Sequence, residues 1–458
     1  MSNTATAPTP VRSIPPHPKK GHWLFGNVYH LLKDPITYLR ESSPQFKGIF
    51  TLTSRLINIV VITEPEYVKY VMLDNNKNYK KWFKNDVLEL ILGKGLLTSE
   101  GDFWRKQRRL AQPAFHKERL VKMVDTMTSC TEQQIIKLGQ LSNKKHVDIS
   151  TEMMELTLNI VAGAMFTTHV EGAIEVVSRE IERTSEMATA RFNNPFRLPV
   201  KYPTPVNLRE RKAVKNLDDV LNPIIRERRK STEEHHDLLA MLMEAKDEDT
   251  GEQMSDQQLR DETMTIFLAG HETTALALSW LWYLLDNNPV QAQKLYDEID
   301  QVTQGRTPTL EHLQQMPYTR MVMDEALRLY PPAWMIMREN LEDDEIGGYR
   351  IPKGYTFMIP VYEIHHDVRL WDEPDAFKPE RFSKENAKNH HRFAYFPFGG
   401  GPRQCIGNNF ALMEMQIIIV MMLQKFRFKV SAGFKPEKYP MVTLRMKHGM
   451  MVDVEKRN

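Results

Sequence analysis

The stretch from Phe396 to Leu423, FPFGGGPRQCIGNNFALMEMQIIIVMML, constrains the chain most, because it joins a glycine-rich loop to an apolar segment. Apolar residues recur after the loop at mostly helical spacing, which predicts that Cys405 lies in a tight loop at the start of a buried helix. Partial positive charge and free backbone N–H groups at a helix start favour a thiolate. Glycines at 399–401 let the backbone approach a flat, bulky ligand, and Arg403 is placed to pair with a carboxylate on that ligand.

The string from Phe398 to Gly407 fits F-x-x-G-x-R-x-C-x-G, and it resembles the haem loop of the cytochrome P450 family of haem-thiolate monooxygenases. An isolated cysteine in a glycine-rich loop is more often a small packing residue, but the length of this match favours the haem loop. The resemblance implies haem b as the cofactor, with the Cys405 sulfur as iron ligand and Phe398, Arg403 and Gly407 around the haem. Thiolate ligation pushes electron density toward the iron and favours O–O cleavage.

Composition excludes several classes of function. A net charge of +2 over 458 residues gives no general attraction to nucleic acid or to an anionic membrane. Only two cysteines are present, Cys130 and Cys405, which excludes a disulfide framework and fits a reducing cytoplasm. We therefore expect a cytoplasmic protein without a nucleic-acid partner, in which Cys130 is a packing residue.

The chain shows no obvious internal division. Length alone predicts two or three domains, but no Ser/Gly linker, low-complexity tract or repeat separates them. We expect a disordered, Pro-rich segment at 1–20 and one large domain at 21–458. Residues 1–22 lack the apolar core of a signal peptide, and the longest apolar run, Ile417 to Leu423, is far shorter than the roughly 20 residues of a membrane span. No membrane anchor is expected, and the chain resembles the soluble, bacterial members of the family.

The family resemblance implies a mainly α fold with a small β lobe. β-Branched residues predict strands at 49–52 and 57–62 with a hairpin break at Ser54-Arg55, followed by a helix at 64–73. Residues 116–245 read as successive helices, with 152–166 and 173–187 as examples. The proline-interrupted stretch 192–207 corresponds to the expected lid over the substrate channel.

A long helix is predicted from Gln257 to Leu285, roughly 40 Å at 1.5 Å per residue. Its middle carries Ala269 and Gly270, and because an interior glycine costs about 1 kcal/mol relative to alanine, something is expected to lie against the backbone there. The motif resembles the family's A/G-G-x-D/E-T, in which the small pair leaves room for O2. The acid and the alcohol, here Glu272 and Thr273, then manage the protons that oxygen cleavage requires. A kinked core helix with locally bonded threonines is the structural alternative.

Glu325 and Arg328 have the E-x-x-R spacing, which makes them i,i+3 neighbours on a helix. The resemblance places Arg381, from the later Pro-Glu-Arg-Phe sequence, on the other side of Glu325. It thus implies a Glu325–Arg328–Arg381 network that supports the cysteine loop. E-x-x-R alone also occurs on exposed helices, so the ordered spacing of the three motifs carries this interpretation.

Other cofactor and substrate contacts follow from the resemblance alone. Trp104 and Arg108 lie one helical turn apart and correspond to haem-propionate partners, as does Arg338. A core tryptophan beside a solvated arginine, and an exposed strand arginine, are the alternatives. The expected substrate pocket is mostly apolar and comprises Val87, Leu88, Ile91, Phe267, Ala333, Trp334 and Met335.

The implied reaction uses O2 and two electrons to hydroxylate or O-demethylate a small, mostly apolar compound such as a fatty acid, a terpenoid or a methoxylated molecule. The chain ends soon after the helix that follows Cys405, so electrons are expected from a separate ferredoxin or flavodoxin with its NAD(P)H reductase. Lys106, Arg109, Lys117 and Arg403 form either a basic docking face or a merely solvated one. A haem-thiolate isomerase, a peroxygenase and a non-enzymatic haem sensor remain alternatives, although such proteins do not need the Glu272–Thr273 pair.

Overall fold

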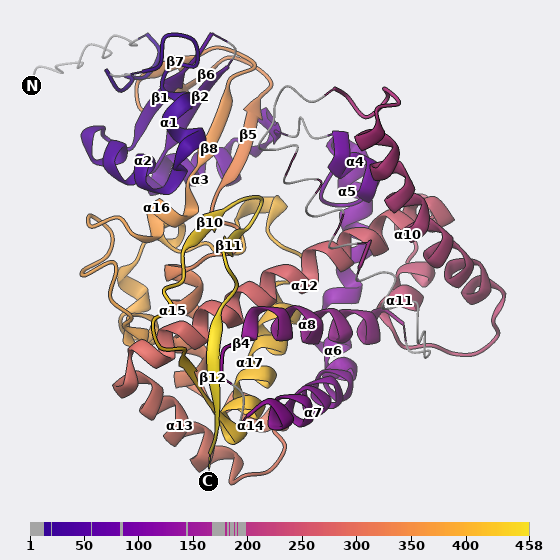
Figure 1. Cartoon of the computed structure of the whole chain (residues 1–458). Helices are drawn as coiled ribbons and strands as arrows, with labels where there is room; N and C mark the ends of the chain where they lie inside the picture. The colour runs from indigo at the N-terminus through magenta and orange to yellow at the C-terminus, as the bar shows by residue number, and fades with distance from the viewer. Residues whose placement is uncertain are drawn as a thin grey trace, which may run out of the picture. The chain divides into compact units, whose positions relative to one another are not determined.

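The computed structural model describes residues 13–457 except 20, 56, 83–85, 143–144, 167–178, 181–182, 184–186, 188–189 and 191–197. The chain divides into two compact units. Unit 1 comprises Met1–Trp82, Ala333–Asp375 and Lys388–Cys405, and unit 2 comprises Phe83–Pro332, Ala376–Ala387 and Ile406–Asn458. Helices dominate, as expected, and a small sheet region accompanies them (Figure 1). The expected boundary at residue 20 stays a prediction.

Unit 1 is built on a five-stranded sheet of order β1-β2-β8-β5-β3 (Figure 1). Its strands are β1 (Ile49–Thr53), β2 (Asn58–Ile62), β3 (Tyr79–Lys81), β5 (Ile336–Asn340) and β8 (Thr356–Ile359), and a separate hairpin pairs β6 (Asp344–Ile346) with β7 (Tyr349–Ile351). Only the β2–β8 pair is parallel. The two predicted strands and the break between them are confirmed, since Ile49 pairs with Ile62 in an antiparallel register.

One apolar core holds unit 1 together. Ile49, Val60 and Ile62 contribute to it from one face of the β1–β2 hairpin, and Phe50 on the other face is also fully buried. The helices of this unit are α1 (Val28–Lys33), α2 (Pro35–Ser42), α3 (Pro65–Lys69) and α16 (Val361–His365). The helix predicted at 64–73 is α-helical only through α3 and continues as a π turn over Tyr70–Asp74. Val71 and Met72, adjacent in that turn, are both buried in the core.

Unit 2 is helical and surrounds one long helix, α12 (Asp256–Asn287). A capping box formed by Ser255 and Gln258 starts it, and most residues from Leu259 to Leu285 are buried. The other helices are α4 (Asp86–Leu92), α5 (Gly101–Ala111), α6 (Lys117–Leu120), α7 (Val124–Leu141), α8 (Ile149–Met165), α10 (Pro205–Lys230), α11 (Leu238–Glu244), α13 (Pro289–Thr303), α14 (Leu310–Gln314), α15 (Pro317–Leu329) and α17 (Asn408–Lys425). The helices predicted at 257–285 and 152–166 are confirmed by α12 and α8. The helix predicted at 173–187 lies largely outside the described residues, as does the first part of the expected lid, and α10 takes up the lid's last residues.

Two small sheets complete unit 2. One has the order β4-β12-β9, from β4 (Val147–Asp148), β9 (Phe426–Val430) and β12 (Met451–Lys456), and the other pairs β10 (Lys438–Pro440) with β11 (Leu444–Met446).

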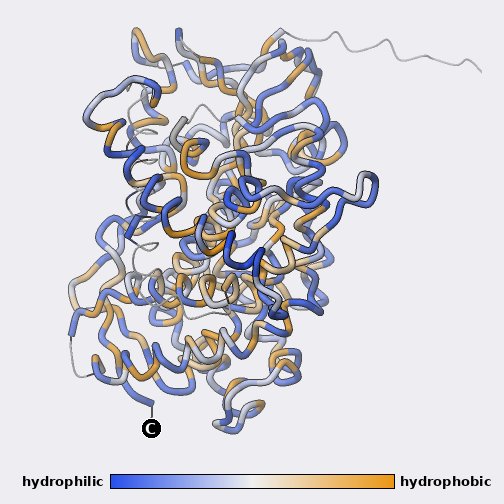
Figure 2. Tube along the Cα trace, turned by 90° about the vertical axis from the view of Figure 1, so that its right-hand side faces the viewer, coloured by the Kyte–Doolittle hydropathy of each residue, from blue (hydrophilic) through white to orange (hydrophobic). Residues whose placement is uncertain are grey.

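Hydrophobic and hydrophilic residues alternate along single helices (Figure 2), which is typical of helices with one buried face. None of the described helices is both long and apolar enough to cross a membrane.

Candidate functional site

The loop that carries Cys405 is a tight, glycine-dependent structure in unit 1. The Cys405 N–H donates to the Phe398 carbonyl at 2.9 Å, which closes the loop, and Cys405 is exposed. Gly401 has φ +66°, and a Cβ at this position would lie 1.9 Å from the Met72 carbonyl oxygen. The chain enters the loop through Phe396, whose N–H donates to the buried His365 ring at 3.1 Å. Position 401 therefore requires glycine, because its backbone lies directly against the π turn.

The arginines and the tryptophan predicted to contact a haem are distributed over both units. In unit 1, Arg338 is buried on β5 with a hydrogen bond to its neighbour's carbonyl, and Arg403 is half-buried in the turn before Cys405. In unit 2, Trp104 is buried and Arg108 half-buried, one turn apart on α5. Gly407 caps the N-terminus of α17 with φ −87°, so its backbone does not require glycine.

The middle of α12 has an uncovered stripe. Leu268 is half-buried on a neighbouring side of the helix. Ala269 is exposed, and Ile266, Gly270 and Thr273 are half-buried. These positions follow the i, i+3, i+4, i+7 pattern and so share one face. The Thr273 hydroxyl is the polar side-chain group on this face, and it donates to the Ala269 carbonyl at 2.9 Å.

The two small residues of the motif have different neighbours. A Cβ at Gly270 would lie 3.0 Å from the Val161 side chain of α8, so the glycine permits close packing of two helices. Ala269 carries the open face instead. His271 packs inward, with its Nδ1 2.8 Å from the Phe267 carbonyl oxygen, and the Thr157 hydroxyl donates to the His271 carbonyl.

Glu272 points away from the open stripe toward the β10–β11 hairpin. Its Oε1 accepts hydrogen bonds from the Thr443 hydroxyl and from Arg445 Nε, the latter at 2.8 Å, and its side chain is 8% exposed. Burial alone would raise the pKa of Glu272, but Arg445, Thr443 and the nearby His271 together lower it. Glu272 is therefore ionised at neutral pH. Sequence reasoning missed Thr443 and Arg445, which belong to no motif.

The three residues of the expected ion network lie together in unit 2. Arg328 makes a bidentate pair with Glu325, with Nε–Oε2 at 2.7 Å and Nη2–Oε1 at 2.8 Å, and both side chains are 0% exposed. Arg381 Nε lies 3.3 Å from Glu325 Oε1, and the Lys378 N–H donates to the same oxygen. One carboxylate thus joins α15 to the Ala376–Ala387 segment.

Another buried carboxyl, Glu414 on α17, was not predicted. It is 0% exposed, and neither of its oxygens has a hydrogen-bond partner among the described residues. Burial raises the pKa of Glu414 well above its usual value, and the nearby Thr274 hydroxyl offsets this only in part. Burial, with Glu414 as a minor contributor, also raises the pKa of Cys130 to about 11, so that cysteine stays a thiol at neutral pH. Glu414 could have been noticed in the sequence, because it is an acidic residue inside a mostly apolar helical run.

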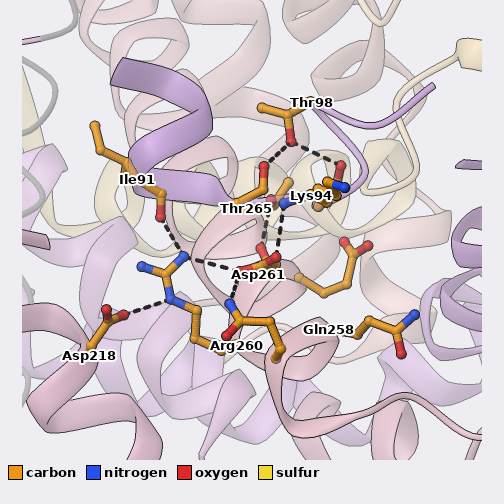
Figure 3. A network of polar contacts seen from close by, with 12 residues as sticks. Ile91, Lys94, Thr98, Asp218, Gln258, Arg260, Asp261 and Thr265 are labelled. Atoms are coloured by element: carbon orange, nitrogen blue, oxygen red, sulfur yellow. Dashed lines mark hydrogen bonds and ion pairs between the residues drawn. The ribbon is translucent and has the colours of Figure 1, made fainter. Parts of the chain in front are cut away.

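The expected substrate residues differ in exposure. Leu88, Ile91, Phe267 and Trp334 are buried, whereas Ala333 is exposed and Met335 half-buried. The side chain of Val87 lies outside the described residues. The loop after Ile91 is attached to α12 by a buried polar network (Figure 3).

The proposed basic docking residues on α5 face an acidic turn of their own unit. Lys106 pairs with Glu252, and Arg109 Nη2 lies 2.7 Å from Asp247 and 2.9 Å from Asp249. The Arg109 hydrogen bond holds the pKa of Asp247 at about 2. The positive charge of this surface is therefore partly neutralised within the unit.

Comparison with known proteins gives one family. The family model described as Cytochrome P450 matches residues 15–452. The chain is 33% identical over 423 residues to the cyclooctatin synthase of Streptomyces melanosporofaciens, covering 92% of this chain and 91% of that protein. It is also 33% identical over 411 residues to that organism's cyclooctat-9-en-7-ol 5-monooxygenase, covering 90% and 88%. A crystal structure of the cytochrome P450DA heme domain superposes with a TM-score of 0.87 at 26% identity, over 98% of both chains.

Proposed function

Because the chain belongs to the cytochrome P450 family, we propose that it hydroxylates or O-demethylates a small, mostly apolar compound. The enzyme is a haem monooxygenase with haem b as its cofactor. The observation that carries the proposal is the Glu272–Thr273 pair beside an uncovered apolar stripe on a mostly buried helix. An isomerase or a sensor does not need that pair.

The residues present fit haem b. Cys405 offers an exposed sulfur at the end of a glycine-shaped loop. The Ala269 stripe is open and apolar, as the face of a flat macrocycle requires, and Trp104, Arg108, Arg338 and Arg403 are proposed to bind its propionates. When bound, the haem supplies the activation of O2. Phe398 and Gly407 are proposed to lie against it.

Thr273 and Glu272 are assigned to proton management. Thr273 lies on the open stripe, where its hydroxyl can exchange its bond to the Ala269 carbonyl for one to a water molecule. Glu272, one residue earlier, holds a negative charge stabilised by Arg445. To relay a proton from solvent toward Thr273, the Glu272 carboxylate exchanges its bonds to Thr443 and Arg445 for water and turns toward the stripe.

Substrate and partners are inferred from chemistry. The pocket residues Leu88, Ile91 and Phe267 are apolar, and one relative is named for an unsaturated alcohol. We therefore propose a terpenoid, a fatty acid or a methoxylated compound as the substrate class. We propose that electrons come from a separate ferredoxin or flavodoxin with its NAD(P)H reductase, and that the enzyme works in the cytoplasm.

The test begins with the ligand. Reduced wild-type protein with carbon monoxide should show the absorption band for which the family is named, and Cys405→Ala should lose it, while Cys130→Ala should keep it. A Cys405→Ala protein with an intact band contradicts the assignment. NADPH with a ferredoxin and its reductase should then give product from an apolar compound panel, whereas NADPH alone or hydrogen peroxide alone should give little.

A further inference from the structure

Arg260, in the second turn of α12, is a buried arginine that joins three elements. Its Nε lies 2.7 Å from Asp218 Oδ1 on α10, and its Nη1 donates to the Ile91 carbonyl in the last turn of α4 at 2.7 Å. The same Nη1 lies 3.2 Å from Asp261 Oδ1 (Figure 3). The Arg260 side chain is only 5% exposed, so these contacts replace water.

The next two residues hold the backbone of the loop between α4 and α5. Asp261 Oδ2 accepts the Lys94 N–H at 2.8 Å, and Glu262 Oε2 accepts the Leu96 N–H at 3.1 Å. Gln257 Nε2 also donates to Asp261 at 2.9 Å. Asp261 and Glu262 accept from main-chain N–H groups of the loop, so their bonds fix the path of the loop whatever side chains the loop carries. Removing one acceptor would leave a buried N–H unsatisfied.

The loop sequence fits this contact. Gly93 has φ +54°, and a Cβ there would lie 2.2 Å from the Asp261 carboxylate. A Cβ at Gly95 would lie 2.1 Å from the Thr265 hydroxyl of α12. Thr98 closes the turn by donating to the Gly93 carbonyl at 2.6 Å. Two glycines thus allow the loop backbone to lie directly on α12.

We propose that Arg260, Asp261 and Glu262 form a clamp whose role is to set substrate selectivity. The clamp fixes α4, α10 and the Gly93–Ser99 loop to α12, and so holds Ile91 and Leu96 in fixed positions. The inference rests on the proposed function, which assigns α4 to the substrate pocket. The three clamp residues act through the loop and are positioning residues. When α4 and the Gly93–Ser99 loop are held in one position, the substrate pocket accepts few substrate shapes. When they can move, it accepts more.

The first experiment measures hydrogen exchange in the haem-loaded full chain. Arg260→Gln, Asp261→Ala and Glu262→Ala should speed exchange of the Lys94 and Leu96 amides by about tenfold or more, because alanine removes the acceptor oxygen that Asn or Gln would keep. The Thr319 amide, bound to Glu298 at 2.7 Å in the same unit, is the internal reference and should not change. Arg229→Gln is the matched control, because Arg229 also joins α10 to the start of α12, through Asp256 and Met254, without contacting the loop.

The second experiment measures binding of apolar compounds of different shape by the optical shift of the haem. The clamp variants should lose selectivity between linear and branched compounds by about threefold to tenfold, with little change in turnover number. Arg260→Lys should keep only part of the wild-type selectivity, because a lysine cannot bridge three acceptors in fork geometry. Arg260→Gln and Asp218→Asn should be strongly non-additive.

Two results overturn the proposal. Equal acceleration at Thr319 would mean that the cluster contributes to global stability only. Faster loop exchange with unchanged binding selectivity would mean that the loop is held but does not choose the substrate. A wild-type enzyme that yields no product with any donor would refute the proposed reaction instead, while exchange and binding still decide the clamp.

Discussion

Glu325 and Glu414 are both completely buried in unit 2, yet they meet the cost of burial in opposite ways. Glu325 accepts from Arg328, Arg381 and the Lys378 amide. Glu414 has no donor among the described residues, and burial raises its pKa so that it keeps its proton. Burial does not by itself set the charge of a carboxyl group; the nearest cation does.

Glu272 is a third solution, between these two. It is nearly buried and has one arginine, but that arginine comes from a hairpin and is itself 27% exposed. The fully enclosed pair at Glu325 suits a scaffold, because nothing must move. A carboxylate whose cation is partly open to water suits proton transfer, because the pair can be solvated without unfolding the unit.

The largest expected effect follows from removing Arg328. Arg328→Ala leaves Glu325 buried with only Arg381 as a cation, and breaking a buried pair in this way costs about 3–5 kcal/mol. We expect poor expression and little haem, measured as urea unfolding and haem content. Lys215→Ala on α10 removes an exposed i,i+4 pair with Asp219 in the same unit and should cost no more than about 0.5 kcal/mol. A soluble, haem-replete Arg328→Ala enzyme with normal turnover would contradict the scaffold role.

The next effect tests whether Glu272 and Thr273 work on protons. Thr273→Ala should keep substrate affinity and NAD(P)H consumption but release more hydrogen peroxide and less product. Glu272→Gln should slow oxygen consumption itself, with about 10²- to 10⁴-fold as the limit for a lost proton-transfer group. The measurement is the ratio of product to NAD(P)H consumed.

Thr274→Ala is the control for that ratio. Its hydroxyl donates to the Gly270 carbonyl on a buried side of the same helix, and the ratio should stay at the wild-type value. If both threonine variants change stability alone and leave the ratio unchanged, the pair is structural.

A third prediction separates Glu272 from Glu414 by pH. Arg445 lowers the pKa of Glu272, so the stability from this pair is present above the unfolded-state pKa and is lost as pH falls through the folded-state pKa. Arg445→Gln should therefore cost about 1.5–3 kcal/mol near pH 7, and the gap to wild type should close as pH falls. Lys447→Gln, which removes an exposed pair with Glu437 in the same region, should show no such gap. A gap that widens toward acid would contradict the assignment.

The local patterns in the sequence predicted much of this structure. The helical period of α12, the β1–β2 hairpin and the i,i+3 pair of Glu325 and Arg328 each arise within a few residues, where spacing alone decides which side chains meet. The family and its cofactor followed from the Cys405 loop.

What the sequence did not predict depends on distant packing. Arg445 reaches Glu272 from far along the chain, and only the tertiary fold makes them neighbours. Gly270 was expected to leave space, whereas Val161 of α8 fills it. Gly93 and Gly95 belong to no motif, and only their position against Asp261 and Thr265 of α12 explains them. In each case the missing information was which segment lies opposite.

The last prediction concerns Glu414. In the folded protein its raised pKa keeps the proton, whereas the unfolded chain ionises near pH 4.3, so the folded state binds more protons between these two values. The contribution of the protonated carboxyl is therefore fully present below the unfolded-state pKa and declines as pH rises, by about 1.4 kcal/mol per pH unit at most.

Glu414→Gln has no proton to retain, so its stability relative to wild type should rise steadily from about pH 5 to neutral pH. Glu414→Leu should show the same slope with a different offset, because it also lacks the buried polar group. The measurement is the urea midpoint of all three proteins at several pH values. Parallel curves for wild type and Glu414→Gln would mean that Glu414 is ionised in the folded protein. It would then need a cation, and the contrast with Glu325 would disappear.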